Sequence, residues 1–174
     1  MQYKILTADA CLADIFKRYH HPRRFIEACR QCPNFGRQWS CPPLAEDYIE
    51  SLKGYKTITV CAAEIPVQAG TPSHKAVDVM EPEHPLLTDY LMRLEHETGG
   101  RAACTIGKCR LCKDSCARLS GHPCRHPDLM RPSPEALGFD LQALLHDLFS
   151  IDLQWSSAET LPPKLYLIGA LFHD

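Results

Sequence analysis

Apolar residues recur at intervals of three and four along much of the chain, which is the spacing of amphipathic helices. The first such segment starts at Thr7, where either Thr7 or Asp9 can cap it. Gly54 and Gly99 end two later helices, and Asp140 caps the last. The predicted helices cover residues 7–19, 23–28, 44–52, 86–94 and 141–149.

Four other segments have the composition of β-strands. Residues 55–65 are rich in β-branched side chains, and shorter strands are predicted at 101–106 and 151–155. Residues 165–172 are almost entirely apolar, so we expect a buried, central strand there. This order indicates an α/β (α+β) fold in which helices cover a mixed sheet of about four strands. We expect a single metal-binding domain over residues 1–174, for the reasons given below.

Composition narrows the class of protein. The 174 residues are enough to bury a core without disulfide support, and the net charge of -2 gives no overall bias toward nucleic acid or membrane. No apolar run reaches the length of about 20 residues that a membrane span needs. Residues 1–21 lack the pattern of a secretion signal, so we expect a cytoplasmic protein.

Ten cysteines are the unusual feature of the composition, and in a reducing compartment they would not persist as disulfides. Seven of them fall into two groups, each within a segment whose prolines and glycines prevent regular structure. The first group is Cys29, Cys32 and Cys41, and the second is Cys109, Cys112, Cys116 and Cys124. Thiolates are the ligands that zinc and iron–sulfur clusters select, so both groups predict metal binding.

The second group favours a [4Fe–4S] cluster. It is a compact run of three cysteines followed by Cys124 after a loop that contains Gly121 and Pro123, which is a common arrangement around such clusters. Zinc sites more often use two separated Cys-x2-Cys pairs, and neither group has a second pair. Zinc remains the alternative, as does a role for these cysteines as buried small residues.

The first group has three thiols and therefore lacks a fourth ligand. Candidates for that ligand are Cys61, His20, His21, a cysteine of the second group, or a water or substrate at an open position. Phe35 and Trp39 are predicted to shield a metal from water. The remaining cysteines, Cys11, Cys61 and Cys104, are expected to be buried small residues, and His126 is the other histidine to follow.

Positive charge is concentrated around both groups. Six Lys or Arg lie in residues 17–37 against Glu27, and six lie in residues 108–131 against Asp114 and Asp128. Nearby cations stabilise the negative charge of a thiolate-ligated metal centre. A basic face for nucleic acid is the competing interpretation, but the chain as a whole is slightly acidic, so nucleic acid is not the partner we expect.

The segments CRQCPNFGRQWSCPP and GKCRLCKDSCARLSGHPCRHPDLMRPSPEALGFD resemble an uncharacterised prokaryotic family of predicted metal-binding proteins, domain of unknown function 2284. The resemblance covers both cysteine groups and, more loosely, residues 3–172. It implies that the seven grouped cysteines bind metal, and it implies no particular activity. Pro42, Pro43, Arg125 and residues 131–133 also match the family motif, whereas Cys104 lies outside it.

Two functions are therefore compatible with the sequence. The first is a cytoplasmic iron–sulfur protein that acts in electron transfer or cluster-assisted chemistry with a protein redox partner. The alternative is a zinc-stabilised module that binds a protein or nucleic acid. The sequence has no glycine-rich phosphate loop, nucleophile elbow or acid/base pair that would indicate an enzyme independently of the metal.

Overall fold

A four-stranded sheet forms the centre of the computed structural model, which describes residues 4–104 and 107–174. Its strands are β1 (Lys4–Cys11), β2 (Thr57–Pro66), β3 (Arg101–Ala103) and β4 (Lys164–His173), in the order β1-β2-β4-β3. The predicted sheet of about four strands with helices is confirmed, and β4 is one of the two central strands, as expected. Every pairing is antiparallel, so the sheet is not mixed.

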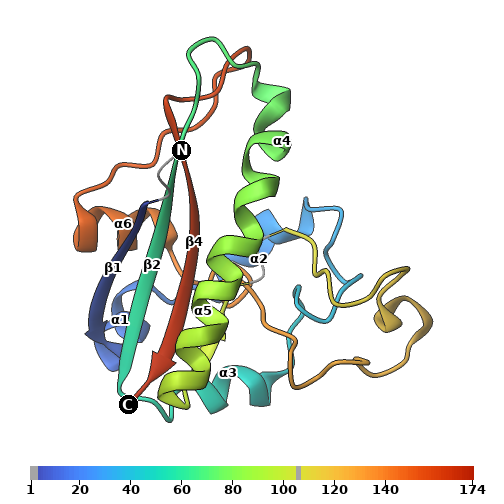
Figure 1. The fold of residues 1–174 in the computed structure, drawn as a ribbon. Coiled ribbons are helices and arrows are strands. Elements are labelled where there is room, and N and C mark those ends of the chain that lie inside the picture. Colours follow the sequence, from blue (N-terminus) through green and yellow to red (C-terminus); the bar gives the residue numbers. More distant parts are fainter. Residues whose placement is uncertain (1–3, 105–106) are drawn as a thin grey trace.

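Six α-helices surround this sheet (Figure 1). They are α1 (Leu12–Tyr19), α2 (Pro22–Arg30), α3 (Glu46–Leu52), α4 (Ala76–Met80), α5 (His84–Thr98) and α6 (Leu141–Phe149). Three short 3-10 turns, η1 (Ser73–Lys75), η2 (Glu81–Glu83) and η3 (Ala117–Ser120), complete the regular structure of the described residues. The predicted ends are confirmed at Gly99, which is left-handed after α5, and at Asp140, whose carboxylate accepts a hydrogen bond from the backbone N–H of Ala143.

The sheet is buried on both faces because its inner strands are apolar on both sides. On β2, Ile58, Val60 and Ala62 face one cluster, which includes residues of α1 and α6. The intervening residues of the same strand, such as Cys61 and Ala63, face a second cluster with residues of α5. Helices therefore cover the sheet on both faces, and Figure 1 shows α5 crossing in front of β4.

Two predictions of local structure were wrong. Residues 7–11 belong to β1 rather than to a helix, because β1 pairs with β2 along its whole length, and helical spacing begins only at Leu12. Residues 151–155 have no regular structure, although Ile151 and Leu153 still pack against the core. Of the strand predicted at 101–106, residues 101–103 are confirmed, and residues 105–106 lie outside the described part of the chain.

Both cysteine groups lie beside the sheet rather than in it. The segment between α2 and α3 and the segment from 107 to 130 lie together at one side of the molecule (Figure 1). The second segment is tied to the fold where it ends, because the buried Arg131 forms an ion pair with Glu95 of α5. None of the described helices is long and apolar enough to span a membrane.

Candidate metal centre

The first cysteine group lies on consecutive tight turns after α2. Cys29 is in the last turn of this helix, and the backbone N–H of Cys32 donates to the Cys29 carbonyl at 2.9 Å. Gly36 has a φ of 68° and donates its N–H to the Pro42 carbonyl at 2.9 Å, which folds the segment back on itself. Burial raises the pKa of the Cys41 thiol in this folded segment, and the Cys32 and Cys29 thiols raise it further.

The four cysteines of the second group line one hollow of about 580 Å³. Cys116 precedes η3, the left-handed Gly121 ends it, and the chain then returns to Cys124. Trp39 of the first loop lines the same hollow. Arg37 and Lys108 place two cations on its wall and Asp114 one carboxylate.

The two loops are held against each other by hydrogen bonds of the Asn34, Gln38, Trp39 and Arg118 side chains. The Gln38 Oε1 accepts from the backbone N–H of Cys109 at 2.6 Å, and the Trp39 indole N–H donates to the His122 carbonyl at 3.1 Å. Arg118 bridges back to the first loop by donating to the carbonyls of Gln38, Cys41 and Pro43. Its guanidinium also lies over the Trp39 ring, 4.9 Å from the centroid.

The thiols of the two groups are close enough to influence each other electrostatically. Burial raises the pKa of Cys109, and the thiols of Cys116, Cys124 and Cys112 raise it further. Burial likewise raises the pKa of Cys41, to which Cys109 of the other group also contributes. The two predicted groups therefore lie side by side where the loops meet, and we call them together the candidate metal centre.

The donor set of this centre suits a metal or a metal cluster. Seven thiols lie on the two loops and the last turn of α2, and four of them line one hollow. Among residues 4–104 and 107–174, no three side chains of His, Cys, Asp or Glu lie close enough, as they stand, to hold a metal ion. Ligation would therefore require these side chains to turn toward a common centre.

Comparison with known families agrees with this interpretation. A family model described as predicted metal-binding protein (DUF2284) matches residues 17–172, which include all seven grouped cysteines. The chain belongs to the DUF2284 family. Neither the curated proteins nor the solved structures give a match to it.

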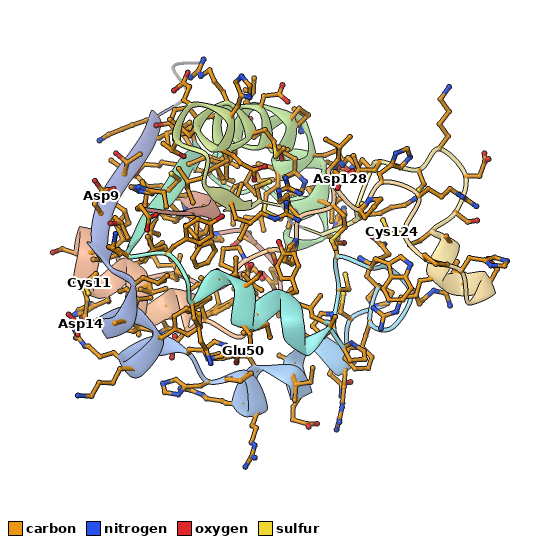
Figure 2. All side chains as sticks on the ribbon, turned by 90° about the horizontal axis from the view of Figure 1, so that it is seen from below. Asp9, Cys11, Asp14, Glu50, Cys124 and Asp128 are labelled. Atoms are coloured by element: carbon orange, nitrogen blue, oxygen red, sulfur yellow. The ribbon has the colours of Figure 1, made fainter. Side chains whose placement is uncertain are left out.

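The other three cysteines of this DUF2284 protein lie apart from the two groups. Cys61 and Cys104 are buried, as predicted, and burial raises the pKa of each to about 12. Cys11 is exposed, so the prediction that it is buried was wrong. Figure 2 shows it with Asp9 and Asp14 on the opposite side of the molecule from Cys124.

Three of the candidates for the fourth ligand of the first group have other roles. Cys61 packs in the cluster beneath α5. The His20 ring is hydrogen-bonded to the Leu137 carbonyl and packs against Phe16 and Phe139, and the His21 ring is hydrogen-bonded to the Arg18 carbonyl. His126 is half-buried, and its carbonyl accepts from the N–H groups of Leu129 and Met130.

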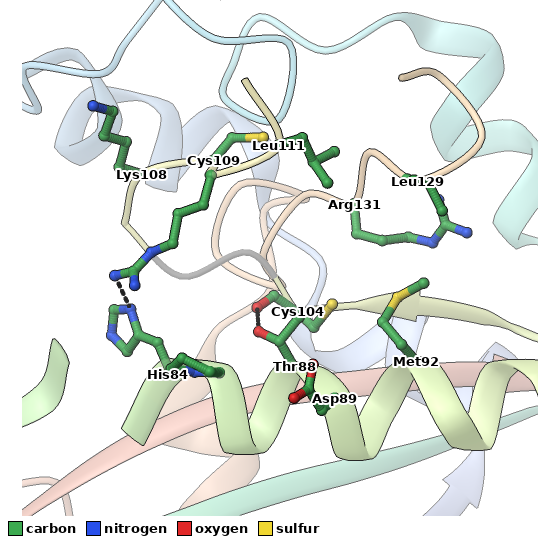
Figure 3. A pocket seen from close by; sticks show the side chains of 12 residues that line it. His84, Thr88, Asp89, Met92, Cys104, Lys108, Cys109, Leu111, Leu129 and Arg131 are labelled. Carbon is green, nitrogen blue, oxygen red and sulfur yellow. Dashed lines mark hydrogen bonds between the residues drawn. The ribbon is translucent and has the colours of Figure 1, made fainter. Parts of the chain in front are cut away.

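A second hollow, of about 360 Å³, lies between α5 and the second loop (Figure 3). Cys104 lies on the α5 side, where its carbonyl accepts a hydrogen bond from Thr88, and Cys109 lies across the hollow. Arg110 reaches over to Nδ1 of His84 at 3.2 Å and forms an ion pair with Glu81. These contacts fix the start of the second loop on the N-terminal end of α5.

Much of the positive charge near the cysteines is paired with acids. Arg24 pairs with Asp140, Arg110 with Glu81 and Arg131 with Glu95. The charge count of the sequence therefore overstates the positive field at the centre, where Arg37 and Lys108 line the hollow and Arg118 and Arg125 donate to carbonyl groups of the loops.

Sequence reasoning missed three residues of the centre. Gln38 and Arg118 connect the loops, and Glu135 carries a buried carboxyl group whose charge raises the pKa of Cys29. None of the three carries a thiol or an imidazole, so a search for metal ligands by cysteine spacing does not find them. Gln38 lies inside the first of the two segments that carry the family resemblance, and Arg118 and Glu135 lie inside the second; this position was the available signal.

Proposed function

We propose that this protein is a cytoplasmic iron–sulfur protein that transfers electrons to or from a protein partner, or supports cluster-assisted chemistry with it. Cys109, Cys112, Cys116 and Cys124 would hold a [4Fe–4S] cluster. Cys29, Cys32 and Cys41 would form a second metal site beside it. The observation that carries the proposal is the hollow of about 580 Å³ that all four cysteines of the second group line.

A hollow with thiols on its wall suits a cluster because a cuboidal cluster occupies volume, whereas one ion needs its ligands gathered at a point. When bound, the cluster would supply a one-electron redox couple. The protein would hold the thiolates, shield them with Trp39 and offset their negative charge with Arg37 and Lys108, which line the same hollow.

Contact between the two loops supports a joint role for the two sites. Gln38 and Arg118 connect the loops directly, and Cys109 influences the pKa of Cys41 across the junction. Metal centres this close can exchange electrons. The second site would then either pass electrons to the partner or be the place where the chemical reaction occurs. A partner would have access from the side where the loops project beyond the sheet (Figure 1).

The test is the metal content of anaerobically purified protein. We expect brown protein with iron and acid-labile sulfide, and loss of most of the cluster when Cys109, Cys112, Cys116 or Cys124 is changed singly to Ser. Cys104→Ser is the matched control, because Cys104 is buried next to the same loop and outside the hollow lined by the four.

Colourless protein with zinc would instead support the zinc-stabilised binding module for a protein or nucleic acid. Unchanged metal content in all four variants would contradict the assignment of the second group.

A further inference from the structure

The segment that carries Glu135 packs against the start of α2 through an unusually close backbone contact. Gly138 has a φ of 92°, and a Cβ atom there would lie 2.6 Å from Cα of Pro22 at the start of α2. The His21 N–H donates to the Gly138 carbonyl at 2.8 Å, and the Gly138 N–H donates to the Glu135 carbonyl at 2.9 Å. The segment with Glu135 is therefore fixed against α2, the helix whose last turn contains Cys29.

The carboxyl group of Glu135 is buried and incompletely paired. Its Oε2 is one of three buried side-chain oxygen or nitrogen atoms of the described residues that have no hydrogen-bond partner. Burial raises the pKa of Glu135, although Ser133 and the residue's own backbone N–H lower it in part. A buried polar oxygen without a partner destabilises a fold, so its presence calls for a group that the protein chain does not provide.

Glu135 and Cys29 line the same hollow, of about 570 Å³. The other charged side chains on its wall include Arg24, which is bound to Asp140, and Lys164, which is bound to Glu64. A cation at Cys29 would give the unpaired Glu135 oxygen a partner.

We propose that Glu135 is the fourth ligand of the metal site formed by Cys29, Cys32 and Cys41. This inference rests on the proposed function, since it requires a metal at the first group. Three thiolates and one carboxylate complete a four-coordinate donor set. Because a carboxylate is a harder ligand than a thiolate, this position is also the one that a small molecule in the hollow would displace most readily.

The experiment compares metal content and metal release in four variants of the full-length protein purified anaerobically. Cys29→Ser defines the metal that belongs to the first group. Glu135→Gln and Glu135→Leu test the proposed ligand. Glu27→Gln is the matched control, because Glu27 is also near Cys29 on α2 but is exposed and paired with Arg30.

We expect Glu135→Leu to lose the same metal as Cys29→Ser, and Glu135→Gln to release it to a chelator at least about tenfold faster than the parent. Glu27→Gln should match the parent in both measurements. In the metal-free state both Glu135 variants should be at least as stable to urea as the parent, because they remove a buried carboxyl group that lacks a partner.

If the Glu135 variants keep the full metal content while Cys29→Ser loses it, Glu135 is not a ligand and the proposed function stands. If the Glu135 variants are less stable in both metal states with unchanged metal per chain, the residue is structural and the inference is wrong. If Cys29→Ser keeps all its metal, both the inference and the proposed first metal site fail.

Discussion

At the scale of single residues, the buried cysteines of the core differ from the half-buried cysteines of the loops. The thiols of Cys61 and Cys104 have a pKa of about 12 because they are buried within the core. Cys29, Cys41 and Cys109 are only half-buried, and each has a raised pKa to which neighbouring thiols contribute as well as burial. Thiols that lie close enough to raise one another's pKa can bind one metal together, whereas a thiol that is only buried in the core is inert.

Metal binding should therefore strengthen as pH rises. A raised thiol pKa means that the metal-free protein holds these protons at neutral pH, and the metal must displace them. Affinity should increase by up to about tenfold per pH unit for each thiol that is protonated in the free protein. Chelator competition at several pH values between about 6 and about 8 measures this, and an affinity independent of pH would contradict it.

Arg118 should stabilise the centre through its hydrogen bonds to the first loop more than through its positive charge. Its three hydrogen bonds reach the carbonyls of Gln38, Cys41 and Pro43 at 2.8, 2.8 and 2.9 Å. Arg118→Ala should lower the free energy of unfolding by about 2 kcal/mol, because the carbonyls lose a charged donor, and Arg118→Lys should recover less than half of that loss.

The control for Arg118 is Arg125→Ala, which removes the same charge from the same loop. Arg125 is exposed and donates one hydrogen bond, to the Ser115 carbonyl at 3.0 Å. Urea denaturation of the metal-loaded variants gives the comparison. Equal losses of unfolding free energy in the two alanine variants would show that the positive charge, and not the hydrogen bonds between the loops, stabilises the centre.

At the scale of elements, the sequence predicts what local periodicity controls. α5 and α6 follow apolar spacing with clear end signals, and β2 and β4 follow β-branched and apolar runs. β1 was missed because its residues 7–11 can also extend a helical pattern, and only pairing with β2 decides between the two. The segment at 151–155 shows the converse, since apolar residues there pack on the core without joining the sheet.

The sequence likewise predicts one part of the candidate site, and only the fold reveals the other part. Cysteine spacing identifies both groups, because the ligands of each lie close together in the chain. Their contact through Gln38 and Arg118 joins positions about 70 to 80 residues apart, and neither position has a distinctive local pattern. Glu135 is found only when the fold places its segment against α2.

The turn from α5 into β3 depends on Gly100. A Cβ atom at this position would lie 2.3 Å from the Phe172 carbonyl oxygen, which belongs to the backbone of β4 and cannot move aside easily. Gly100→Ala should therefore destabilise the protein by about 1 to 3 kcal/mol. Gly54→Ala should have little effect, since its nearest contact would be the Ser51 carbonyl oxygen at 3.5 Å. Thermal denaturation of the two variants distinguishes them, and equal melting temperatures would argue against this close contact.

At the scale of the whole molecule, the hydrophobic core and the metal centre use different residues. Among the described residues, neither core cluster includes any of the seven grouped cysteines. The loops are instead held by polar contacts with each other and by the ion pair of Arg131 with Glu95. The sheet and its helices should therefore keep their structure when the metal is removed, while the loops lose order.

The two tryptophans allow this separation to be measured. Trp39 is half-buried in the first loop and bound to the His122 carbonyl of the second, whereas Trp155 is 77% exposed. In Trp155→Phe, removal of the metal should shift the emission of Trp39 to longer wavelength, because the loops separate and water reaches the ring. In Trp39→Phe, the emission of Trp155 should hardly change, and far-ultraviolet circular dichroism should be retained in both variants. Loss of the circular dichroism signal together with the metal would instead mean that the centre and the core fold as one unit, since metal-binding free energy would then stabilise the whole molecule.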